Sequence, residues 1–395
     1  MKQTGAISCL VELGLRFLGL WPGLSCAIVN WNLCILSLLL AQYFLYSYAV
    51  LNLDINHISH LVDCLSVAFA YTLLTLKLAN LTLKRRALRE MIDMIAEDWK
   101  EASITATNMT VMLRNAELSR ICSNILMSFH ALAVVLYVIG GYVIQLVQSN
   151  NDTLKIPVRM LLPFDYSTSP IFELTMMGQF LHQLFLVMLE TTLIINSIHR
   201  TIVINHKYIS ITFYQILHVS GQIDILCENV RQVTLKRFEF LSTTRKLIYR
   251  HQKIIHFTDN INDLFSFMAL IEFVWSTIVI CCIGFAIMTS IGTEDALTMM
   301  TKYVTFYIAV TLEALIFCCS GEYLSAKSKS ISDAVYESLW YNLKPRECQV
   351  LLFILMRSQK HLTITTGGLM DLSLEVFTSI MKASASYISV LHAMY

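Results

Sequence analysis

The C-terminal stretch from Asn342 to Tyr395 decides how this chain folds: it reads NLKPRECQVLLFILMRSQKHLTITTGGLMDLSLEVFTSIMKASASYISVLHAMY. Its first apolar run, VLLFILM, is too short to cross a bilayer and is followed at once by basic residues. Residues 372–395 carry only two charges, Glu375 and Lys382, and exceed the roughly 20 residues that a membrane-spanning helix needs. We therefore predict a last transmembrane helix over 371–395 and an amphipathic helix outside the membrane within 335–370.

The composition of the whole chain is that of a multi-pass membrane protein. Of its 395 residues, 56% are hydrophobic and 14% are charged, whereas a soluble domain has about 25% charged residues. The net charge of +1 gives no reason to expect a nucleic-acid partner. Metal, phosphate and nucleophile motifs (HExxH, P-loop, nucleophile elbow) are absent, and His130 and His182 have no second ligand at metal spacing. We expect no enzyme activity, no metal and no cofactor, and we interpret both histidines as hydrogen-bonded helix contacts.

Six further apolar stretches are long enough to span the bilayer. No proline lies inside them, so unbroken helices are predicted. The predicted spans are Leu24–Leu45, Ile58–Leu81, Ile121–Val147, Phe172–Ile195, Leu264–Ile287 and Met299–Cys319.

The distribution of lysine and arginine predicts the orientation. These residues concentrate between spans two and three, four and five, and six and seven, while the other loops hold only Lys155 and Arg159. Positive loops stay in the cytosol, which predicts a cytosolic N-terminus and an extracellular C-terminus. The sequon at Asn151 then lies outside and is a candidate for glycosylation. This orientation is inverted relative to G-protein-coupled receptors, whose DRY-type and NPxxY-type signatures are also missing.

The predicted cytosolic parts are expected to be structured. Between spans four and five, Ile223, Leu226, Val230 and Val233 recur in steps of three and four, which is typical of an amphipathic helix that packs on a partner. We therefore expect a cytosolic N-terminal segment (1–23), six transmembrane helices with cytosolic extensions (24–334), a cytosolic anchor helix (335–370) and the last span (371–395).

Several motifs give the chain a family resemblance. They are RSQKHLTITTGG (Arg357–Gly368), LSLEVFTSIMKASASYISVL (Leu372–Leu391), SGEYL (Ser320–Leu324), YESLWYNL (Tyr336–Leu343), LLPFDYSTSP (Leu161–Pro170) and LGLWP (Leu18–Pro22). With these motifs the chain resembles the insect odorant receptors, most closely those of ants, bees and wasps. It departs from the last-helix pattern of the related gustatory receptors, and it lacks the large insertion of the odorant co-receptor between spans four and five. It is therefore similar to a ligand-tuning subunit.

This resemblance implies a ligand-gated, non-selective cation channel in the plasma membrane of olfactory sensory neurons. Four subunits surround one pore that passes monovalent and divalent cations, and the tuning subunit assembles with odorant co-receptor subunits. The cytosolic ends of spans four to six and the helix before the last span form an anchor. A small volatile organic ligand binds in the outer half of the helix bundle.

The last helix is the expected pore lining. Matching SYISVLHAM to the family pattern places Val390 and Met394 at an apolar gate, with Leu391 as the competing choice. Lys382 lies near the middle of this span. Such a charge is expected to flank the pore in an aqueous vestibule or to pair with Glu313 of span six.

Ligand contacts are expected from residues at the outer ends of spans two, three, four and six. Aromatic, methionine and hydroxyl groups suit small apolar ligands, although ordinary packing is the alternative for each residue. The candidates are Val67, Tyr71, Tyr137, Val138, Gly141, Tyr142, Met176, Phe180, Gln183, Tyr303, Phe306 and Tyr307.

A second hypothesis is a monomeric seven-helix chemoreceptor or transporter that signals through a cytosolic partner. It predicts neither an ion current nor a tetramer. An inverted-repeat transporter should also have helices broken at the midplane in matching positions, and these spans show no such pattern, with Gly140-Gly141 as the only glycine pair.

Overall fold

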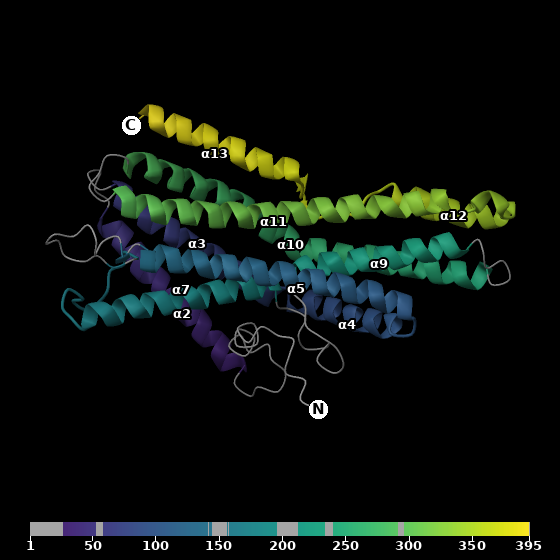
Figure 1. Ribbon diagram of the computed structural model, residues 1–395, viewed down its shortest axis with the longest axis horizontal. Helices are drawn as coiled ribbons and strands as arrows, with labels where there is room; N and C mark the ends of the chain where they lie inside the picture. Colours follow the sequence, from purple (N-terminus) through teal and green to yellow (C-terminus); the bar gives the residue numbers. More distant parts are fainter. Residues whose placement is uncertain are drawn as a thin grey trace.

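The chain folds as one elongated helical bundle (Figure 1). The computed structural model describes residues 27–52, 58–140, 142–143, 156, 158–195, 212–233, 240–290 and 296–394. Its elements are α2 (Ala27–Leu51), α3 (Ile58–Leu83), α4 (Arg85–Ala102), α5 (Ala106–Val135), the π-helical turn η2 (Leu136–Gly140), α7 (Ile171–Ile195), α9 (Thr212–Val233), α10 (Phe240–Ser290), α11 (Ala296–Glu337), the 3-10 turn η4 (Trp340–Asn342), α12 (Pro345–Ser358), β1 (Thr365–Thr366), β2 (Met370–Asp371) and α13 (Leu374–Met394).

The seven predicted spans coincide with α2, α3, α5 with η2, α7, α10, α11 and α13. Within the described ranges, five helices are long and apolar enough to cross a membrane by length and composition, namely all of these except α7 and α13. The apolar part of α7 is shorter, Ile171–Val187, and α13 carries Glu375 and Lys382.

Helices α10 and α11 are much longer than a membrane is thick. They contain 51 and 42 residues, or about 75 and 63 Å at 1.5 Å per residue, against about 30 Å of hydrocarbon. Roughly half of each helix must therefore project beyond the bilayer. The projecting halves lie beside α9, α4 and α12 at one end of the bundle (Figure 1).

The buried stripe of α9 contributes to the apolar core of this projecting end. Ile223, Leu226, Val230 and Val233 are each fully buried, which confirms the amphipathic helix predicted from their spacing. They belong to the same apolar core as residues of α10 and α11, including Ile261 and Leu324. The core is therefore continuous from the spans into the projecting end.

One predicted feature differs in the structure. The third span is not a regular α-helix throughout, because it widens into the π turn η2 at Leu136–Gly140. The amphipathic helix predicted within residues 335–370 is α12, which begins at Pro345. The same residues also contain the end of α11, η4 and a two-stranded hairpin, in which Gly367 and Gly368 turn the chain with φ of 62° and 73°.

Asp98 of α4 connects the projecting helices through contacts with a histidine and a lysine. Its Oδ2 lies 2.9 Å from Nε2 of His218 in α9, and its Oδ1 lies 2.8 Å from Nζ of Lys253 in α10. Burial raises the pKa of the Asp98 carboxyl, but the contacts with His218 and Lys253 outweigh burial and hold that pKa below its usual value. A lowered pKa stabilises the fold above the ordinary pKa of an aspartate, and the stabilisation is lost as the pH falls through the lowered value.

We therefore expect Asp98→Asn to reduce the free energy of unfolding by about 3 kcal/mol at neutral pH, because it weakens a buried pair. The measurement is the Tm of the detergent-solubilised protein, and the difference from wild type should shrink as the pH falls below the ordinary pKa of an aspartate and through the lowered pKa of Asp98. Glu97→Gln is the matched control. Glu97 also contacts Lys253, at 2.8 Å, but its side chain is 56% exposed, so the expected loss is below about 1 kcal/mol. Equal effects of the two substitutions would contradict this account.

Candidate functional site

A cavity of about 180 Å³ lies between five helices of the bundle. This volume exceeds the space of a single water molecule many times and suits a small organic molecule. Its walls come from α3, α5 with η2, α7, α10 and α11. The lining residues are Val67, Ala70, Tyr71, Leu73, Leu74, His130, Ala133, Val134, Tyr137, Gln183, Leu186, Val187, Glu272, Trp275, Ser276, Val279, Thr305, Phe306, Ala309, Val310 and Glu313.

A buried ion triad closes one end of this cavity. Lys77 Nζ lies 2.8 Å from Glu272 Oε2 and 2.6 Å from Glu313 Oε1, and the three side chains are 3%, 5% and 10% exposed. The residues come from α3, α10 and α11, so the triad joins three spans. Lys77 Nζ also lies 5.9 Å from the centroid of the Phe317 ring, on the side of α11.

Helical spacing explains why α3 supplies both cavity-lining residues and the lysine of the triad. Val67, Tyr71 and Leu74 follow one another at steps of four and three, and Lys77 continues the same face one turn later. The face that lines the cavity therefore ends in the lysine. Charged groups inside a span are costly unless they are paired, so the two glutamates hold this face of α3 against α10 and α11.

Five of the predicted ligand residues line the cavity together: Val67, Tyr71, Tyr137, Gln183 and Phe306. They come from α3, η2, α7 and α11, which the sequence separates widely. Tyr137 lies in the π turn, and Nζ of the buried Lys302 is 5.3 Å from the centroid of its ring. Widened turns of this kind often occur at functional sites.

Six other predicted ligand residues lie off the wall of this cavity. Tyr303 is 2% exposed and packs against α10 with Val279, Ile283 and Ala286. Tyr307 packs against the same cluster. The remaining four are Val138, which is buried, and Tyr142, Met176 and Phe180, which are partly exposed. Gly141 and the glycosylation candidate Asn151 lie outside the described residues.

A second cavity of about 330 Å³ adjoins the first on the side of α2 and α7. It is open to the surroundings at Phe164, which is 50% exposed. Tyr71 and Gln183 line both cavities and so separate them. The Tyr71 hydroxyl lies 3.1 Å from Nδ1 of His182, so His182 makes the interhelical hydrogen bond that we expected for it.

The short hairpin before α13 is fixed to α10. Asn262 Oδ1 accepts hydrogen bonds from the backbone N–H of Thr365 at 2.7 Å and from its hydroxyl at 2.9 Å. The N–H of Gly367 donates to the Ser266 carbonyl oxygen at 2.9 Å. A Cβ atom on Gly321 of α11 would overlap the backbone of Leu372, so only glycine permits this close approach. The start of α13 is therefore held by both long helices.

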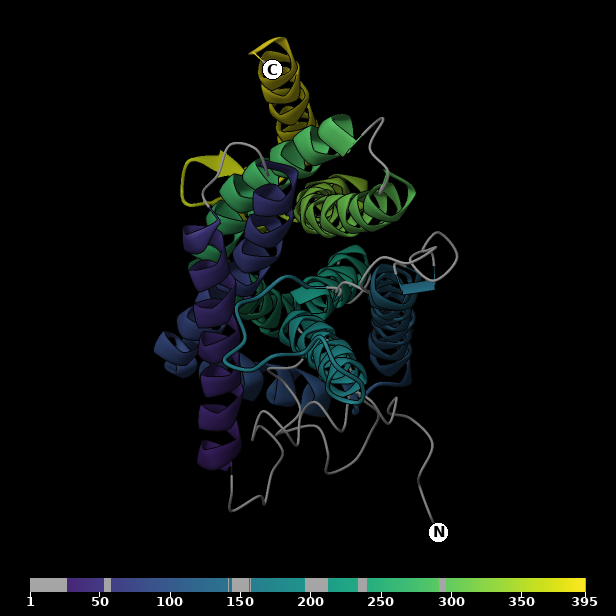
Figure 2. The same cartoon turned by 90° about the vertical axis from the view of Figure 1, so that its left-hand side faces the viewer.

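One face of α13 packs on α10 and α11, and the opposite face is exposed. Val376, Ile380 and Ser384 are buried at successive steps of four. Figure 2 shows α13 protruding from one side of the bundle. The exposed stripe includes Lys382, Ser386 and Val390, and Val390 is 53% exposed.

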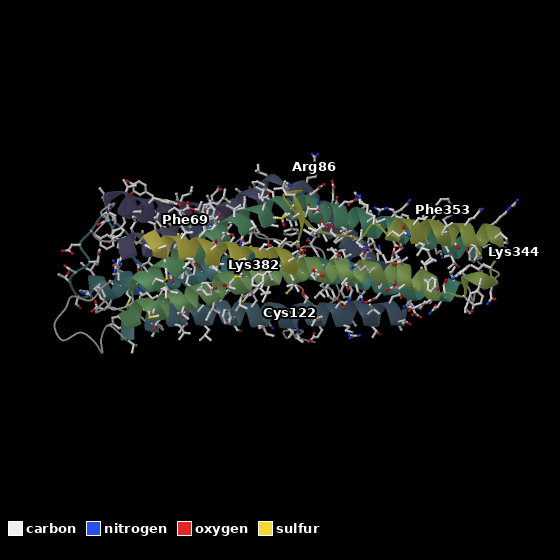
Figure 3. All side chains as sticks on the ribbon, turned by 90° about the horizontal axis from the view of Figure 1, so that it is seen from above. Phe69, Arg86, Cys122, Lys344, Phe353 and Lys382 are labelled. Atoms are coloured by element: carbon white, nitrogen blue, oxygen red, sulfur yellow. The ribbon has the colours of Figure 1, made fainter. Side chains whose placement is uncertain are left out.

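The predicted pore residues all belong to α13. Lys382 is exposed rather than buried beside Glu313, which contacts Lys77 instead (Figure 3). The side chains of Leu391 and Met394, the other two gate candidates, lie outside what the structure describes.

Sequence reasoning missed Lys77, Trp275 and the role of the two glutamates in the cavity. We considered Glu313 only as a partner of Lys382. A usable signal was present, because Lys77 is a cation inside the predicted second span and an intramembrane cation requires a nearby anion. His130, interpreted as a helix contact, lines the cavity near the triad.

We expect Lys77→Met to lower the free energy of unfolding by about 3–5 kcal/mol, because two buried carboxylates lose their cation. The measurements are the Tm and the monodisperse fraction on size-exclusion chromatography. The triple substitution Lys77→Met/Glu272→Gln/Glu313→Gln removes every charge of the triad and should recover most of the loss. If the triple variant is no more stable than Lys77→Met alone, the loss of charge pairing is not the cause of the lower stability.

Comparison with known proteins agrees with this architecture. The family model described as 7tm Odorant receptor matches residues 57–385. Among curated relatives, odorant receptor 67c of Drosophila melanogaster is 27% identical over 149 residues, which cover 38% of this chain and 36% of the relative. Odorant receptor 22c of the same species is 30% identical over 146 residues, covering 37% of this chain and 35% of the relative. The matched stretches thus span only about a third of these relatives.

The fold also matches that of a solved receptor. The insect olfactory receptor OR5 from Machilis hrabei, in complex with eugenol, aligns over 98% of both chains with a TM-score of 0.77 and 13% sequence identity. The same receptor in a second structure gives a TM-score of 0.75 over 96% of both chains, with 15% identity. The family match covers most of the chain, and the chain is therefore a multi-pass membrane protein of the 7tm odorant receptor family.

Proposed function

We propose that this chain is the odorant-binding subunit of a ligand-gated, non-selective cation channel that assembles with odorant co-receptor subunits as a heterotetramer. The observation that carries the proposal is the cavity between five helices, built mainly from apolar side chains with a few polar groups among them. A small volatile ligand fits this environment. The solved Machilis hrabei receptor was determined in complex with eugenol, a small ligand of that protein.

The exposed face of α13 supports its role as the pore helix. Lys382, Ser386 and Val390 follow at steps of four, so copies of this helix around an axis would place a polar stripe toward the centre. Val390 would then form an apolar ring that blocks ions by excluding water, with Met394 and Leu391 near it. Lys382 would flank the ion path.

An exposed apolar face supports assembly with partner subunits. On α12, Leu352, Phe353 and Met356 are 52%, 69% and 58% exposed. Phe353 lies at the projecting end of the bundle (Figure 3). Such a patch is unusual on a protein that stays alone. We propose that this end is the cytosolic anchor, with residues 335–370 at the contact, so that the N-terminal segment 1–23 is cytosolic and the C-terminus is extracellular.

The alternative is a monomeric chemoreceptor or transporter with a cytosolic signalling partner. The α12 face fits that partner as well as it fits another subunit. The exposed polar stripe of α13 favours the channel, because an isolated bundle in lipid gains nothing from Lys382 and Ser386 on its outer surface.

The test is whole-cell current from cells that express this chain with and without an insect odorant co-receptor. We expect volatile ligands to evoke cation current only on co-expression. Ala309→Phe should abolish this current at normal surface expression, because Ala309 lines the cavity and the added ring occupies the ligand volume. The matched control is Ala79→Phe, at an exposed position of α3. Surface protein that gives no current with any ligand would favour the monomeric alternative.

A second test addresses the gate. We expect Val390→Ser to raise the ligand-independent current several-fold, because a polar ring hydrates more readily than an apolar one. Ser379→Ala on the same exposed face, three turns earlier, is the control and should leave the basal current unchanged. Unaltered basal current, rectification and ion preference in Val390→Ser would assign the gate elsewhere on α13.

A further inference from the structure

Several hydrogen-bond donors on the wall of this cavity already have partners within the protein. The indole N–H of Trp275 donates to the Phe69 carbonyl oxygen at 2.6 Å, and the hydroxyl of Ser276 donates to Glu272 Oε1 at 3.2 Å. The hydroxyl of Thr305 donates to the backbone carbonyl one turn earlier at 2.7 Å. Three wall donors are therefore engaged within the protein.

The triad adds acceptors and no spare positive charge. Lys77 directs its ammonium at both carboxylates, at 2.6 and 2.8 Å, and does not itself line the cavity. Glu272 and Glu313 do line it. A carboxylate accepts at about four lone-pair positions, so each can hold Lys77 and accept from a ligand as well.

We propose that the cavity selects ligands with a hydrogen-bond-donating head, a hydroxyl or a protonated amine, which binds the Glu272–Glu313 end. The apolar body of the ligand lies toward Val67, Phe306 and Val310. This inference rests on the proposed function, since it names the ligand class of the same cavity. The position of the cavity identifies the ligand site, and the hydrogen-bond donors and acceptors on its wall identify the chemical class of the ligand.

Ligands that only accept hydrogen bonds cannot use the two carboxylates at the triad end of this cavity. The lining residues that carry an N–H or O–H suited to such a ligand are His130, Gln183, Tyr71 and Tyr137. Gln183 belongs to the partition toward the second cavity, whereas the carboxylates lie at the end closed by the triad. Hydrogen bonds to a charged acceptor are also about twice as strong as those between neutral groups. A donor head at the triad is therefore the better arrangement.

The experiment compares ligands of equal chain length that differ only in the head: a primary amine, an alcohol, a methyl ether and a ketone. Dose–response currents on co-expression with the co-receptor are measured together with saturable binding to the purified chain. We expect half-maximal concentrations for the amine and the alcohol about tenfold lower than for the ether and the ketone, the factor typical of one hydrogen bond to a charged group. Equal potency of all four heads, or higher potency of the ketone, overturns the inference and leaves the proposed function standing.

The Glu313→Gln substitution distinguishes a loss of ligand recognition from a general structural effect. This change leaves Lys77 and Glu272 as a neutral pair, and it replaces an acceptor on the wall with an amide that also donates. The amine and the alcohol should lose about tenfold in potency, while the ketone keeps or gains potency. The same substitution at Glu117, an exposed glutamate of α5 away from the cavity, should change the potency of neither the donor nor the acceptor ligands.

The outcomes distinguish the two proposals. A parallel loss for every ligand in Glu313→Gln shows a structural effect only and overturns the assigned role of the carboxylates. Opposite changes for donor and acceptor heads support that role. Absence of saturable binding for all four heads, in wild-type protein that reaches the surface, overturns the proposed function itself.

Discussion

The pairing of Lys77 with Glu272 and Glu313 is the constraint on which the bundle depends. Three charges lie almost fully buried inside spans, where a charge without a partner is costly. Their pairing fixes the rotation of α3 against α10 and α11, because each charge must point at the same place. The cavity then exists at a defined position, since the apolar residues preceding Lys77 on α3 face the space between the other helices.

This constraint also brings the cavity close to the last helix. Glu272 lines this cavity, and it also lines a small void of about 10 Å³ together with Leu372, Val376 and Ile380 at and just before the start of α13. The same glutamate therefore borders the proposed ligand space and the packing surface of α13. If a ligand binds one arrangement of the triad more tightly than another, the proposed site and α13 are coupled through this glutamate.

Much of the fold followed from hydropathy alone. Long apolar stretches predicted all seven spans, and the spacing of Ile223, Leu226, Val230 and Val233 predicted the buried stripe of α9. The candidate site was less predictable. Tyr71 and Phe306 line the cavity, but Tyr303 does not, although it lies on the same helix as Phe306. A sequence locates a residue along a span, whereas the rotation of that span against its neighbours decides which side chains meet.

The sequence by itself determined the class of protein, the positions of the spans and the family, because these depend on composition, local periodicity and motifs. Only the tertiary structure decided which intramembrane charges pair and which face of each helix lines the cavity. In the folded protein Glu313 contacts Lys77, which is 236 residues away along the chain, and Lys382 is exposed. The physical reason is that ion pairing and cavity formation depend on distances between helices, which local sequence does not encode.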